Sequence, residues 1–534
     1  MSKVVGTVVG VVVVAGIAWT GAAYYTGTKV EKELIASIDK ANVELAKVMP
    51  VPGIKFALAS FERGVFSSDA RYTATLSLPA QEGKPAPAPI EVLVSDHIEH
   101  GPFPWSRVKT GKLAPMMATS NAKLEKNGTL DAWFVATKDV PPVSSTFSLG
   151  YGGSSTGVVR LAPAEYAEGD SKLNFSGLDV NADVGKNGES VKVSGLIESI
   201  VATTLSKADG KPLALDFKGV SFDSDMSKGI ADMYLGKYSM TTKSLTIAEA
   251  QDKPMIVLRD LVQRADLGEQ NQKLNVVVGY EVGGVNYKGK DVGGGQFVMK
   301  GGNLDPVALK TLNDLYRDMY VRALKSMGSK GEEELPEMTP EQAQAMQGAM
   351  LALLAGNPTL SIDPLLIKTS KGESTFNLNL SLTKPSDKAA SIDAMILETI
   401  KTLDAKLVVS KGMLAEIFTI AATQEGADPA QAAQMATMQS ELVAGMGAQA
   451  GVVKVEGDKI TSTLNYAAGQ VDFNGKKMPV EEFAGEVFSM VLGSGANMGL
   501  SGGDMDDEEE EEDELEEAPA DEAVPAEPAT RVKP

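Results

Sequence analysis

The stretch Arg71-Tyr72-Thr73-Ala74-Thr75-Leu76-Ser77-Leu78 alternates polar and apolar side chains one by one. A period of two is typical of a half-buried β-strand. Short runs of this kind, separated by glycine and proline clusters, continue from residue 54 to about residue 303. Among them, Gly185-Lys186-Asn187-Gly188 lies between two alternating runs and predicts a hairpin turn. We therefore expect the region 29–303 to be mainly β.

Beyond residue 303 the spacing of the apolar residues becomes helical. Asp305-Pro306 and Thr339-Pro340 each place a proline directly after a capping side chain, which predicts helices that end near Met327 and Leu354. Further helices are expected at 29–48, 108–113, 227–233, 412–423, 428–446 and 479–492, strands at 360–383, and a closing hairpin at 460–473. The predicted fold class is a β-rich α+β protein, with a large body of antiparallel sheets and hairpins and with helices concentrated in the C-terminal half.

A short sequence pattern occurs twice, once in each part of this body. Tyr280-x2-Gly283-x5-Gly289-Lys290 has the same spacing as Tyr466-x2-Gly469-x5-Gly475-Lys476, and both segments precede a helix that begins at a proline. Duplication of a hairpin–helix unit would produce this similarity, but hairpins share turn glycines in any case. The region 304–492 is therefore expected to be a mixed helix and hairpin region, in which a repeat and a coincidence are both open.

The segment 4–23 carries no charge and follows a short basic start at Lys3. As a helix it would span about 30 Å, the thickness of the hydrocarbon core of a bilayer. Trp19, Tyr24 and Tyr25 gather at its far end, where aromatic rings favour the lipid–water interface. A cleaved signal peptide, and hence a secreted body, is the alternative, but the apolar run is long for one. We expect a retained anchor over residues 1–28, with the body outside the cytoplasm.

The composition excludes several kinds of site. The 534 residues include no cysteine, which removes disulfides, thiolate metal sites and cysteine nucleophiles, and only two histidines, His97 and His100. Much of the net charge of −21 comes from residues 504–527, which include fifteen acids. We expect this tail, 493–534, to be disordered, because it can bury little apolar surface. The rest of the chain shows no basic face, so no nucleic-acid partner is expected.

Four motifs together resemble the YdgA family of Gram-negative bacterial envelope proteins. They are Trp19-Thr20-Gly21 with Tyr25-Thr26-Gly27, Arg63-Gly64-Val65-Phe66-Ser67-Ser68, His100-Gly101-Pro102-Phe103-Pro104, and Tyr466-x2-Gly469-x4-Asn474-Gly475-x2-Met478-x4-Phe483. The resemblance implies a single-pass protein of the inner membrane whose body faces the periplasm. It implies no biochemical activity, because the family has none established, and it does not extend to the acidic tail. We expect the motif positions to be structural.

Two local patterns are found in catalytic or metal sites of other proteins. His97 and His100 would point to opposite faces of a strand, so a structural corner at residues 101–104, with the Phe103 ring buried, is favoured over a metal site. Gly153-Ser154-Ser155-Thr156-Gly157 matches the hydrolase pattern G-x-S-x-G, but both histidines precede Ser155 and a strand-like run follows it. We predict no catalytic, cofactor-binding or metal-binding residue.

Two predicted helices carry large apolar residues at helical spacing. One stripe is Met435, Met438, Leu442 and Met446, and the other is Met346, Met350 and Leu354. Methionine can line adaptable binding grooves. A stripe of this kind more often packs in the core, which is the position expected here.

These observations predict a non-enzymatic protein of the cell envelope with a binding or scaffolding role. Its expected partners are the lipid bilayer, through the N-terminal helix, and an envelope protein or lipid. Handling of a lipid or another apolar ligand is the alternative, because amphipathic hairpins and helices can build an apolar groove; a hydrolase is less favoured. Apolar lining residues that stay exposed in the fold would favour lipid handling over scaffolding. Convergent acid–base residues in a pocket would favour a hydrolase.

Overall fold

The computed structural model describes residues 38–39, 42–43, 54–64, 66–76, 89–206, 210–250, 253–326, 338–386 and 392–486. The predicted anchor, with Trp19, Tyr24 and Tyr25, and the predicted acidic tail both lie outside these residues. None of the helices in the described ranges is both long enough and apolar enough to cross a membrane. All the strands belong to one compact unit, residues 1–480.

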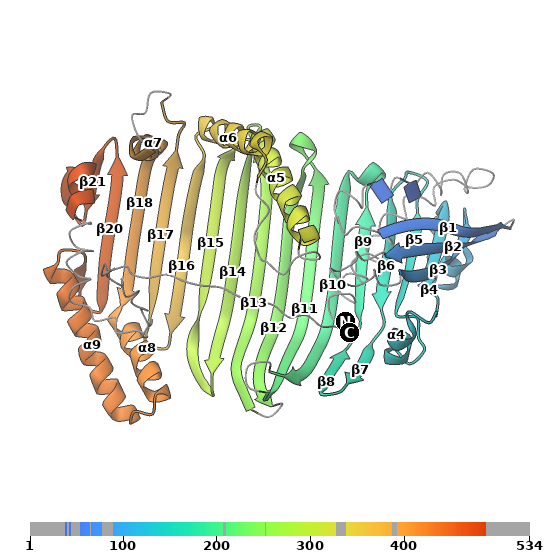
Figure 1. The fold of residues 1–534 in the computed structure, drawn as a ribbon, viewed down its shortest axis with the longest axis horizontal. Coiled ribbons are helices and arrows are strands. Elements are labelled where there is room, and N and C mark those ends of the chain that lie inside the picture. The colour runs from blue at the N-terminus through green and yellow to red at the C-terminus, as the bar shows by residue number, and fades with distance from the viewer. Residues whose placement is uncertain are drawn as a thin grey trace, which may run out of the picture. The chain divides into compact units, whose positions relative to one another are not determined.

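The described strands form one antiparallel sheet of 22 strands (Figure 1). Hydrogen-bonded neighbours follow the chain from β1 to β6, pass to β9, and continue through β10 to β18, β20, β21 and β22. The β7–β8 hairpin pairs with the part of β10 beyond β9, and β19 pairs with the start of β20. 

The first strands are short and the middle ones are long. The bounds are β1 Ile54–Arg63, β2 Ser67–Leu76, β3 Ile90–His100, β4 Ala118–Leu124, β5 Val143–Leu149, β6 Ser155–Leu161, β7 Ala164–Glu168, β8 Ser171–Phe175, β9 Leu178–Val184, β10 Ser190–Leu205, β11 Pro212–Lys228, β12 Tyr234–Ala250, β13 Lys253–Gln270, β14 Lys273–Tyr287, β15 Lys290–Leu304, β16 Thr359–Thr369, β17 Gly372–Leu382, β18 Ile400–Ser410, β19 Lys454–Glu456, β20 Lys459–Ala467, β21 Gln470–Phe473 and β22 Lys476–Pro479. Tight turns with positive φ at both central residues, such as Lys288-Gly289 and Asn474-Gly475, join neighbouring strands. This turn geometry matches the right-handed twist of antiparallel strands.

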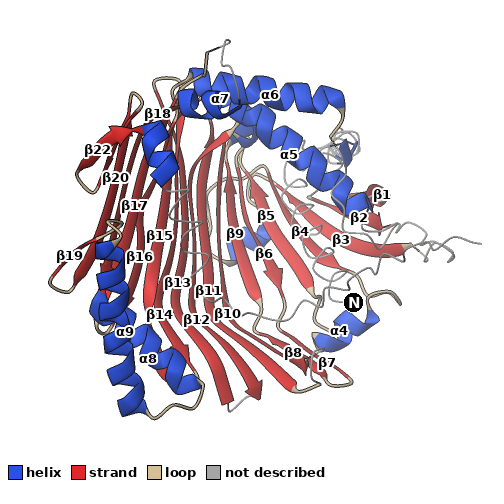
Figure 2. Ribbon diagram, turned by 60° about the vertical axis from the view of Figure 1, so that its left-hand side comes forward, coloured by secondary structure: helices blue, strands red, loops and turns tan. Residues whose placement is uncertain are grey.

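The larger helices lie near the ends of the strands (Figure 2). α5 (Pro306–Ser326) follows β15, packs against α6 (Pro340–Ala355), and reaches the short turn Ile230–Asp232 between β11 and β12. α8 (Lys411–Gln424) packs against α9 (Pro429–Gln449) and contacts β16, β17 and β18. Three shorter helices are α3 (Trp105–Lys109), α4 (Asp131–Ala136) and α7 (Ile392–Thr399). Residues 480–486, within the helix expected at 479–492, are also helical.

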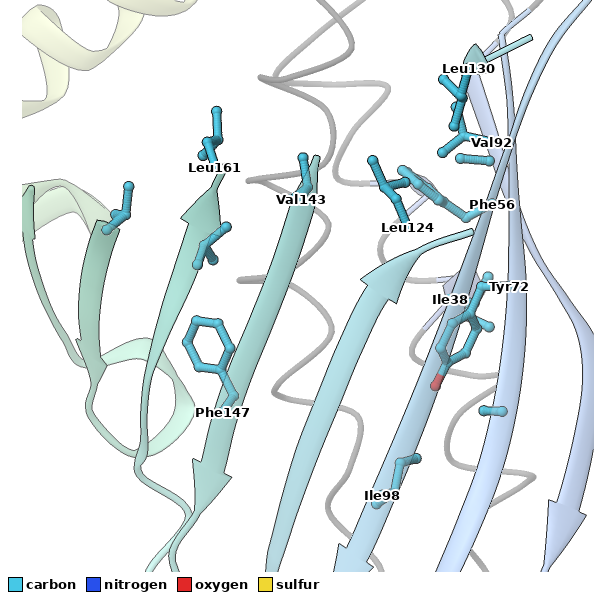
Figure 3. Packing of buried hydrophobic residues seen from close by; sticks show 14 of the residues in the cluster. Ile38, Phe56, Tyr72, Val92, Ile98, Leu124, Leu130, Val143, Phe147 and Leu161 are labelled. Carbon is cyan, nitrogen blue, oxygen red and sulfur yellow. The ribbon is translucent and has the colours of Figure 1, made fainter. Parts of the chain in front are cut away.

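The largest buried core lies on one face of β1–β6 and β9 (Figure 3). Its strand members include Tyr72, Val92, Ile98, Leu124, Val143, Phe147, Val159, Leu161 and Val180. Ile38, from the helical residues before β1, and Phe134 of α4 join this core. The side chain of Asn42 ties that helical segment to β1: its Nδ2 donates to the Phe56 carbonyl at 3.0 Å, and its Oδ1 accepts from the Phe56 amide at 2.8 Å.

Several predicted elements are present. The turn at residues 185–189 joins β9 to β10, and α5, α6, α8 and α9 begin within two residues of their expected starts. The side chains of Thr339, Ser410 and Asp428 cap α6, α8 and α9 by accepting hydrogen bonds from first-turn amides. Capping satisfies amides that have no partner within the helix, which explains why these starts could be read from the sequence.

Other expectations were wrong or incomplete. The helix expected at 227–233 is not formed, because Ser227 and Lys228 pair with β12 and extend β11. The helix expected at 108–113 is the shorter α3, and the strand β18 was missed. β15 pairs with β16, so the sheet continues across the boundary expected near residue 303. In the repeated sequence pattern, Gly289 and Gly475 occupy equivalent turns, whereas Gly283 lies within β14 and Gly469 lies in a turn.

Candidate functional site

The motifs at 63–68 and 100–104 come together at one end of β2 and β3. The amide of Gly64 donates to the Ser67 carbonyl at 2.8 Å, which closes the turn between β1 and β2. The amide of His100 donates to the Phe66 carbonyl at 2.8 Å, and His100 Nε2 lies 3.0 Å from Ser68 Oγ. Arg63 is exposed at the end of β1. Two segments that are distant in the sequence therefore form one corner.

Gly101 and Pro102 fix the path of the chain out of β3. The Gly101 amide donates to the Met117 carbonyl at 2.6 Å, and the Pro102 carbonyl accepts from the Met116 amide at 2.9 Å. A Cβ atom on Gly101 would lie 2.0 Å from the Met116 carbonyl oxygen, so the position requires glycine. Pro104, which follows, is fully buried. These contacts fix the path of the chain at the corner.

The expected burial of Phe103 was wrong, since its side chain is 57% exposed. Pro104 takes the buried place beside the sheet, and the ring next to it is left at the surface. α3 then begins at Trp105, and Glu99 Oε2 accepts hydrogen bonds from the Ser106 amide at 2.8 Å and from Ser106 Oγ at 2.6 Å. These bonds hold α3 against β3.

The two histidines do not share a site. His97 Nδ1 lies 2.7 Å from Asp69 Oδ1 at the surface, whereas His100 contacts Ser68. They occupy positions of opposite parity on β3, so their side chains leave opposite faces of the strand. Over the ranges that the structure describes, no group of three or more histidine, aspartate or glutamate side chains is placed to hold a metal ion.

A buried carboxyl, Asp96, was missed by the sequence analysis. Tyr72 Oη donates to its Oδ2 at 3.3 Å, and Ser120 Oγ donates to its Oδ1 at 2.8 Å. Burial raises the pKa of Asp96 to about 6, against the opposing effect of these hydrogen bonds, and burial together with Asp96 raises the pKa of Tyr72. The signal was present in β3, where Asp96 occupies an apolar position between Val94 and Ile98.

The closing motif runs from Tyr466 in β20 to Met478 in β22 and ends at Phe483, in the helical residues that follow. Gly469 and Gly475 both adopt positive φ in turns, which favours glycine. Asn474 Nδ2 donates to the Val452 carbonyl at 2.9 Å, and its Oδ1 accepts from the Thr463 amide at 2.8 Å. Tyr466 Oη donates to the Leu397 carbonyl at 3.5 Å. These contacts join the hairpin to α7 and to the residues before β19.

The apolar face of the sheet continues beyond the core. Val159 and Val180 are buried core residues, and Val180 pairs with Gly195 of β10. From Gly195 a single row of paired residues crosses the sheet to β18: Phe222, Met240, Gln263, Tyr280, Phe297, Leu365, Phe376 and Leu407. Paired residues on adjacent strands share a face. We call this row and its parallel rows the apolar face.

Three parallel rows extend this face. The first runs through Ile197, Val220, Thr242, Leu261, Val282, Gly295 and Ile367; the second through Val193, Ser224, Tyr238, Ala265, Val278, Met299, Ile362, Leu378, Ala405 and Leu464; the third through Val191, Met226, Gly236, Leu267, Val276, Gly301, Leu360, Leu380, Leu403 and Tyr466. None of these positions carries a formally charged side chain.

The opposite face is polar. The adjacent row, one residue along each strand, holds Lys192, Asp225, Lys237, Asp266, Val277, Lys300, Ser361, Asn379, Asp404 and Asn465. Opposite charges pair across strands, as in Lys192–Asp225 at 2.8 Å and Lys237–Asp266 at 3.8 Å. The two faces of β10–β18 therefore differ sharply in chemistry.

The apolar face of β10–β18 is not buried as the core is. Tyr280 and Ile367 are 46% and 47% exposed, and Leu365 is 39% exposed. Most of the other large residues in the rows are half-buried by their neighbours on the sheet. The rings of Tyr280 and Phe297 stack with centroids 6.4 Å apart. Soluble proteins rarely leave a large contiguous apolar surface open without a partner.

A kinked row crosses five strands of this part of the sheet. The regular pairing skips Glu198, Gly219, Lys243, Asp260 and Gly283, which would otherwise lie side by side. Gly219 and Asp260 have positive φ, which interrupts the alternation of side chains. At the same place, the distance along each strand from one apolar residue to the next changes from two residues to three.

Beyond the kinked row the apolar residues form a new row: Ile200, Phe217, Leu245, Leu258 and Val285. Ile200 pairs with Phe175 of β8, and Phe175 packs against the main core. The new row therefore stays on the core side of the sheet. The kinked row therefore shifts the alternation by one residue while the apolar side chains stay on one face.

The chain is similar to known bacterial proteins over most of its length. The model of a bacterial family of unknown function, DUF945, matches residues 1–481. The chain belongs to the DUF945 family. Protein YdgA of Escherichia coli is 29% identical over 490 residues, which cover 90% of this chain and 96% of the relative. The uncharacterized protein YihF of the same organism is 22% identical over 479 residues, with coverage of 89% and 97%.

A third relative is an uncharacterized protein of Haemophilus influenzae, 29% identical over 182 residues, which cover 33% of this chain and 48% of the relative. No solved structure matches the chain. The resemblance to the YdgA family is confirmed by these matches. The family match includes the motif corner and the apolar face, since both lie before residue 481.

In this DUF945 protein the methionine stripe of α9 is at the surface, so its expected place in the core was wrong. Met435, Met438 and Leu442 are between 61% and 65% exposed, and Met446 is 53% exposed. The small residues of α9, Ala432, Ala436, Ser440 and Ala444, are buried instead. Small side chains allow the close approach of α8, which decides which face of α9 turns inward.

Two hollows in the structure are lined by titratable side chains. One, of about 630 Å³, lies between β6 and β9–β12 and includes Asp179, Glu198 and Asp223. The other, of about 490 Å³, lies beside α4 and includes Lys138 and Glu165, which form an ion pair at 2.9 Å. No lysine, arginine or histidine lines the first hollow, and its Asp179 pairs with Arg160 at 3.4 Å. Ser155 of the G-x-S-x-G pattern begins β6 and is buried.

Proposed function

We propose that this protein binds the acyl chains of lipids on the apolar face of β10–β18, without catalysing a reaction. The observation that supports this most is the exposure of residues such as Tyr280, Leu365 and Ile367 within continuous apolar rows. Exposed lining residues are the feature that favours lipid handling over a purely scaffolding role. The predicted membrane anchor and periplasmic body would locate such a protein in the cell envelope.

The size of the face suits acyl chains. Adjacent strands lie about 4.8 Å apart, so the rows from β10 to β20 extend for about 40 Å. The acyl chains of one leaflet occupy about 15 Å, half of the ~30 Å hydrocarbon thickness. Several chains could therefore lie along the rows, each removed from water. Met240 and Met299 add unbranched side chains that adapt to flexible ligands.

The chemistry of the rows favours binding over reaction. Acid–base catalysis needs a titratable group within hydrogen-bond reach of the reacting atoms. The rows hold a few hydroxyls and one amide, Gln263, but no carboxylate, imidazole or amine. Binding of apolar chains needs only area removed from water, at about 25 cal/mol per Å². This supports a carrier or a binding surface rather than a hydrolase.

Two adjacent leucines of β16 give a matched test. Leu365 lies on the apolar face and pairs with Phe297 and Phe376, whereas Leu366 lies on the opposite face and pairs with Gln296 and Thr375. The full chain, Leu365→Glu and Leu366→Glu would be purified from membranes in the same detergent. Bound lipid is then counted by mass spectrometry, and displacement of a fluorescent fatty acid gives the affinity.

We expect lipid with the wild type and with Leu366→Glu, and at least a tenfold loss with Leu365→Glu, because a charge among acyl chains is costly to desolvate. Melting temperatures check that both variants fold. Equal lipid content in the two variants, or none in the wild type, would contradict the proposal. Lipid held by the predicted anchor affects all three proteins equally and so cancels in the comparison.

A further inference from the structure

The motif corner carries large apolar side chains that face solvent. Phe66 is 82% exposed, Phe103 is 57% exposed and Trp105 is 61% exposed. The hydrogen bond from the His100 amide to the Phe66 carbonyl holds the β1–β2 turn beside the start of this segment. Leu113, in the exposed stretch after α3, adds a fourth large apolar residue, 65% exposed. The contacts of the corner described above are structural, yet they do not account for these outward rings.

The segment of this corner that follows Glu99 is basic, although the chain is acidic overall; on the β1–β2 side the exposed carboxylates are Glu62 and Asp69, and Asp69 lies 2.7 Å from His97. Residues 100–124 include no aspartate or glutamate, whereas Lys109 and Lys112 are exposed within them. Lys109 Nζ lies 5.6 Å from the centre of the Trp105 ring. The nearest carboxylate in the sequence, Glu99, is already bound to Ser106. Cations beside exposed aromatic rings fit the headgroup region of an anionic bilayer.

We infer that this corner, formed by Phe66, Phe103, Trp105, Lys109 and Lys112, docks on the surface of a bilayer that contains anionic lipid. The aromatic rings enter the interface, and the two lysines neutralise headgroup phosphates. The methionine stripe of α9 is the contrasting surface: it is equally exposed, but the helix carries one charged residue, Glu441, whose carboxylate pairs with Lys411. The α9 stripe lacks the cations that an anionic surface attracts.

The position of the corner in the chain fits this partner. Ile38 belongs to the same core as Ile98, which lies two residues before His100 on β3. Ile38 is the fifteenth residue after Ala23, the end of the predicted membrane segment. Fifteen residues span at most about 50 Å even when fully extended. If the predicted anchor is in the bilayer, the N-terminal part of the sheet stays within reach of its surface.

Tryptophan fluorescence can test the contact, because the chain has only Trp19, Trp105 and Trp133. The full chain and Trp105→Phe are reconstituted in vesicles of phosphatidylglycerol and brominated phosphatidylcholine, where bromine quenches rings at the interface. We expect Trp105→Phe to lose about half of the lipid-dependent quenching, since Trp133 packs against the core and Trp19 lies in the predicted anchor. Equal quenching in the two proteins would overturn the inference.

A charge-reversal pair then tests the role of the lysines. Lys109→Glu with Lys112→Glu should reduce the quenching of Trp105 at least twofold in anionic vesicles at low salt. The matched control, Lys192→Glu with Lys237→Glu on the polar face of the sheet, should leave it unchanged. An equal loss in the control would show that net charge, and not the corner, controls the contact.

The outcome is independent of lipid binding on the apolar face. Leu365→Glu should leave the quenching of Trp105 intact, and Trp105→Phe should leave the copurified lipid unchanged. Loss of quenching with Leu365→Glu would show that bound lipid, and not the bilayer surface, is what Trp105 contacts, which would also overturn the inference.

Discussion

The strands β1–β6 with β9 and the strands β10–β18 share one apolar face but differ in what lies on it. In the first part, Phe147 and Val159 are almost fully buried, and Ile38 and Phe134 pack in the same cluster. In the second part, Leu365 keeps more than a third of its surface exposed. The alternation of side chains is the same in both. Burial is therefore set by what packs on the face. From the described residues that pack on each, we call the first part covered and the second part uncovered.

The largest expected difference between the two parts comes from a matched pair of leucines. Leu124, in the covered part, is 2% exposed, whereas Leu365, in the uncovered part, is 39% exposed. Leu124→Ala should lower the free energy of unfolding by about 2–5 kcal/mol, because it leaves a cavity in the core. Leu365→Ala should change it by about 0.5 kcal/mol or less. Chemical denaturation of both variants measures the contrast, and equal losses would mean that the apolar face of β16 is covered too.

The second difference concerns polar groups on the shared face. Asp96 is buried in the covered part, and Gln263 lies among apolar residues in the uncovered part. Burial raises the pKa of Asp96 to about 6, whereas an aspartate in the unfolded chain titrates near its ordinary value of about 4. Between these values the folded state binds more protons. The free energy of unfolding should therefore fall as the pH rises from about 4 to about 6, by at most about 3 kcal/mol.

Asp96→Asn should remove this pH dependence, since asparagine does not titrate in the range and can still bond Tyr72 and Ser120. Relative to the wild type, the variant should be most stable at pH values above about 6, where Asp96 is charged. Gln263→Leu should show no pH dependence of its own. Melting curves at several pH values check both. A wild-type stability that rises between pH 4 and 6 in an Asp96-dependent manner would show that the carboxylate is stabilised in its charged form.

The third prediction concerns the boundary between the two parts. A Cβ atom on Gly195 would lie 2.5 Å from the ring of Phe222, which pairs with it and packs at the edge of the core. Gly195→Ala should displace that ring and cost about 1–3 kcal/mol, the usual range for overpacking. Gly268→Ala, at a strand position with open space around it, is the control and should be tolerated. Thermal unfolding compares them; a neutral Gly195→Ala would indicate that the boundary is loosely packed.

The smallest effect is expected on the polar face of the uncovered part. Lys192→Ala removes a cross-strand partner of Asp225, but both side chains are more than half exposed. Water and salt screen such pairs, so the melting temperature should stay within experimental error. The lipid content should also be unchanged, because Lys192 points away from the apolar face. A clear loss of lipid with Lys192→Ala would assign ligand contacts to both faces.

The elements that were predicted correctly are those whose formation depends on residues close together in the sequence. Thr339 and Asp428 cap α6 and α9, and Gly188 adopts the positive φ that its turn requires. By contrast, β18 was missed, because its pairing partners β17 and β20 lie elsewhere in the chain. The candidate sites divide in the same way. The motif corner and Phe103 were named from the sequence, but the exposure of that ring was not foreseen.

By itself the sequence determined the strand alternation, the helix starts, the absence of cysteine chemistry and the family. These follow from properties of single residues and their near neighbours. Only the tertiary structure decided which apolar positions are covered. Met435 of α9 was expected in the core, but the close approach of α8 buries the smaller Ala432 instead. The long apolar rows likewise depend on pairings among distant strands, since a face exists only when the register aligns many strands.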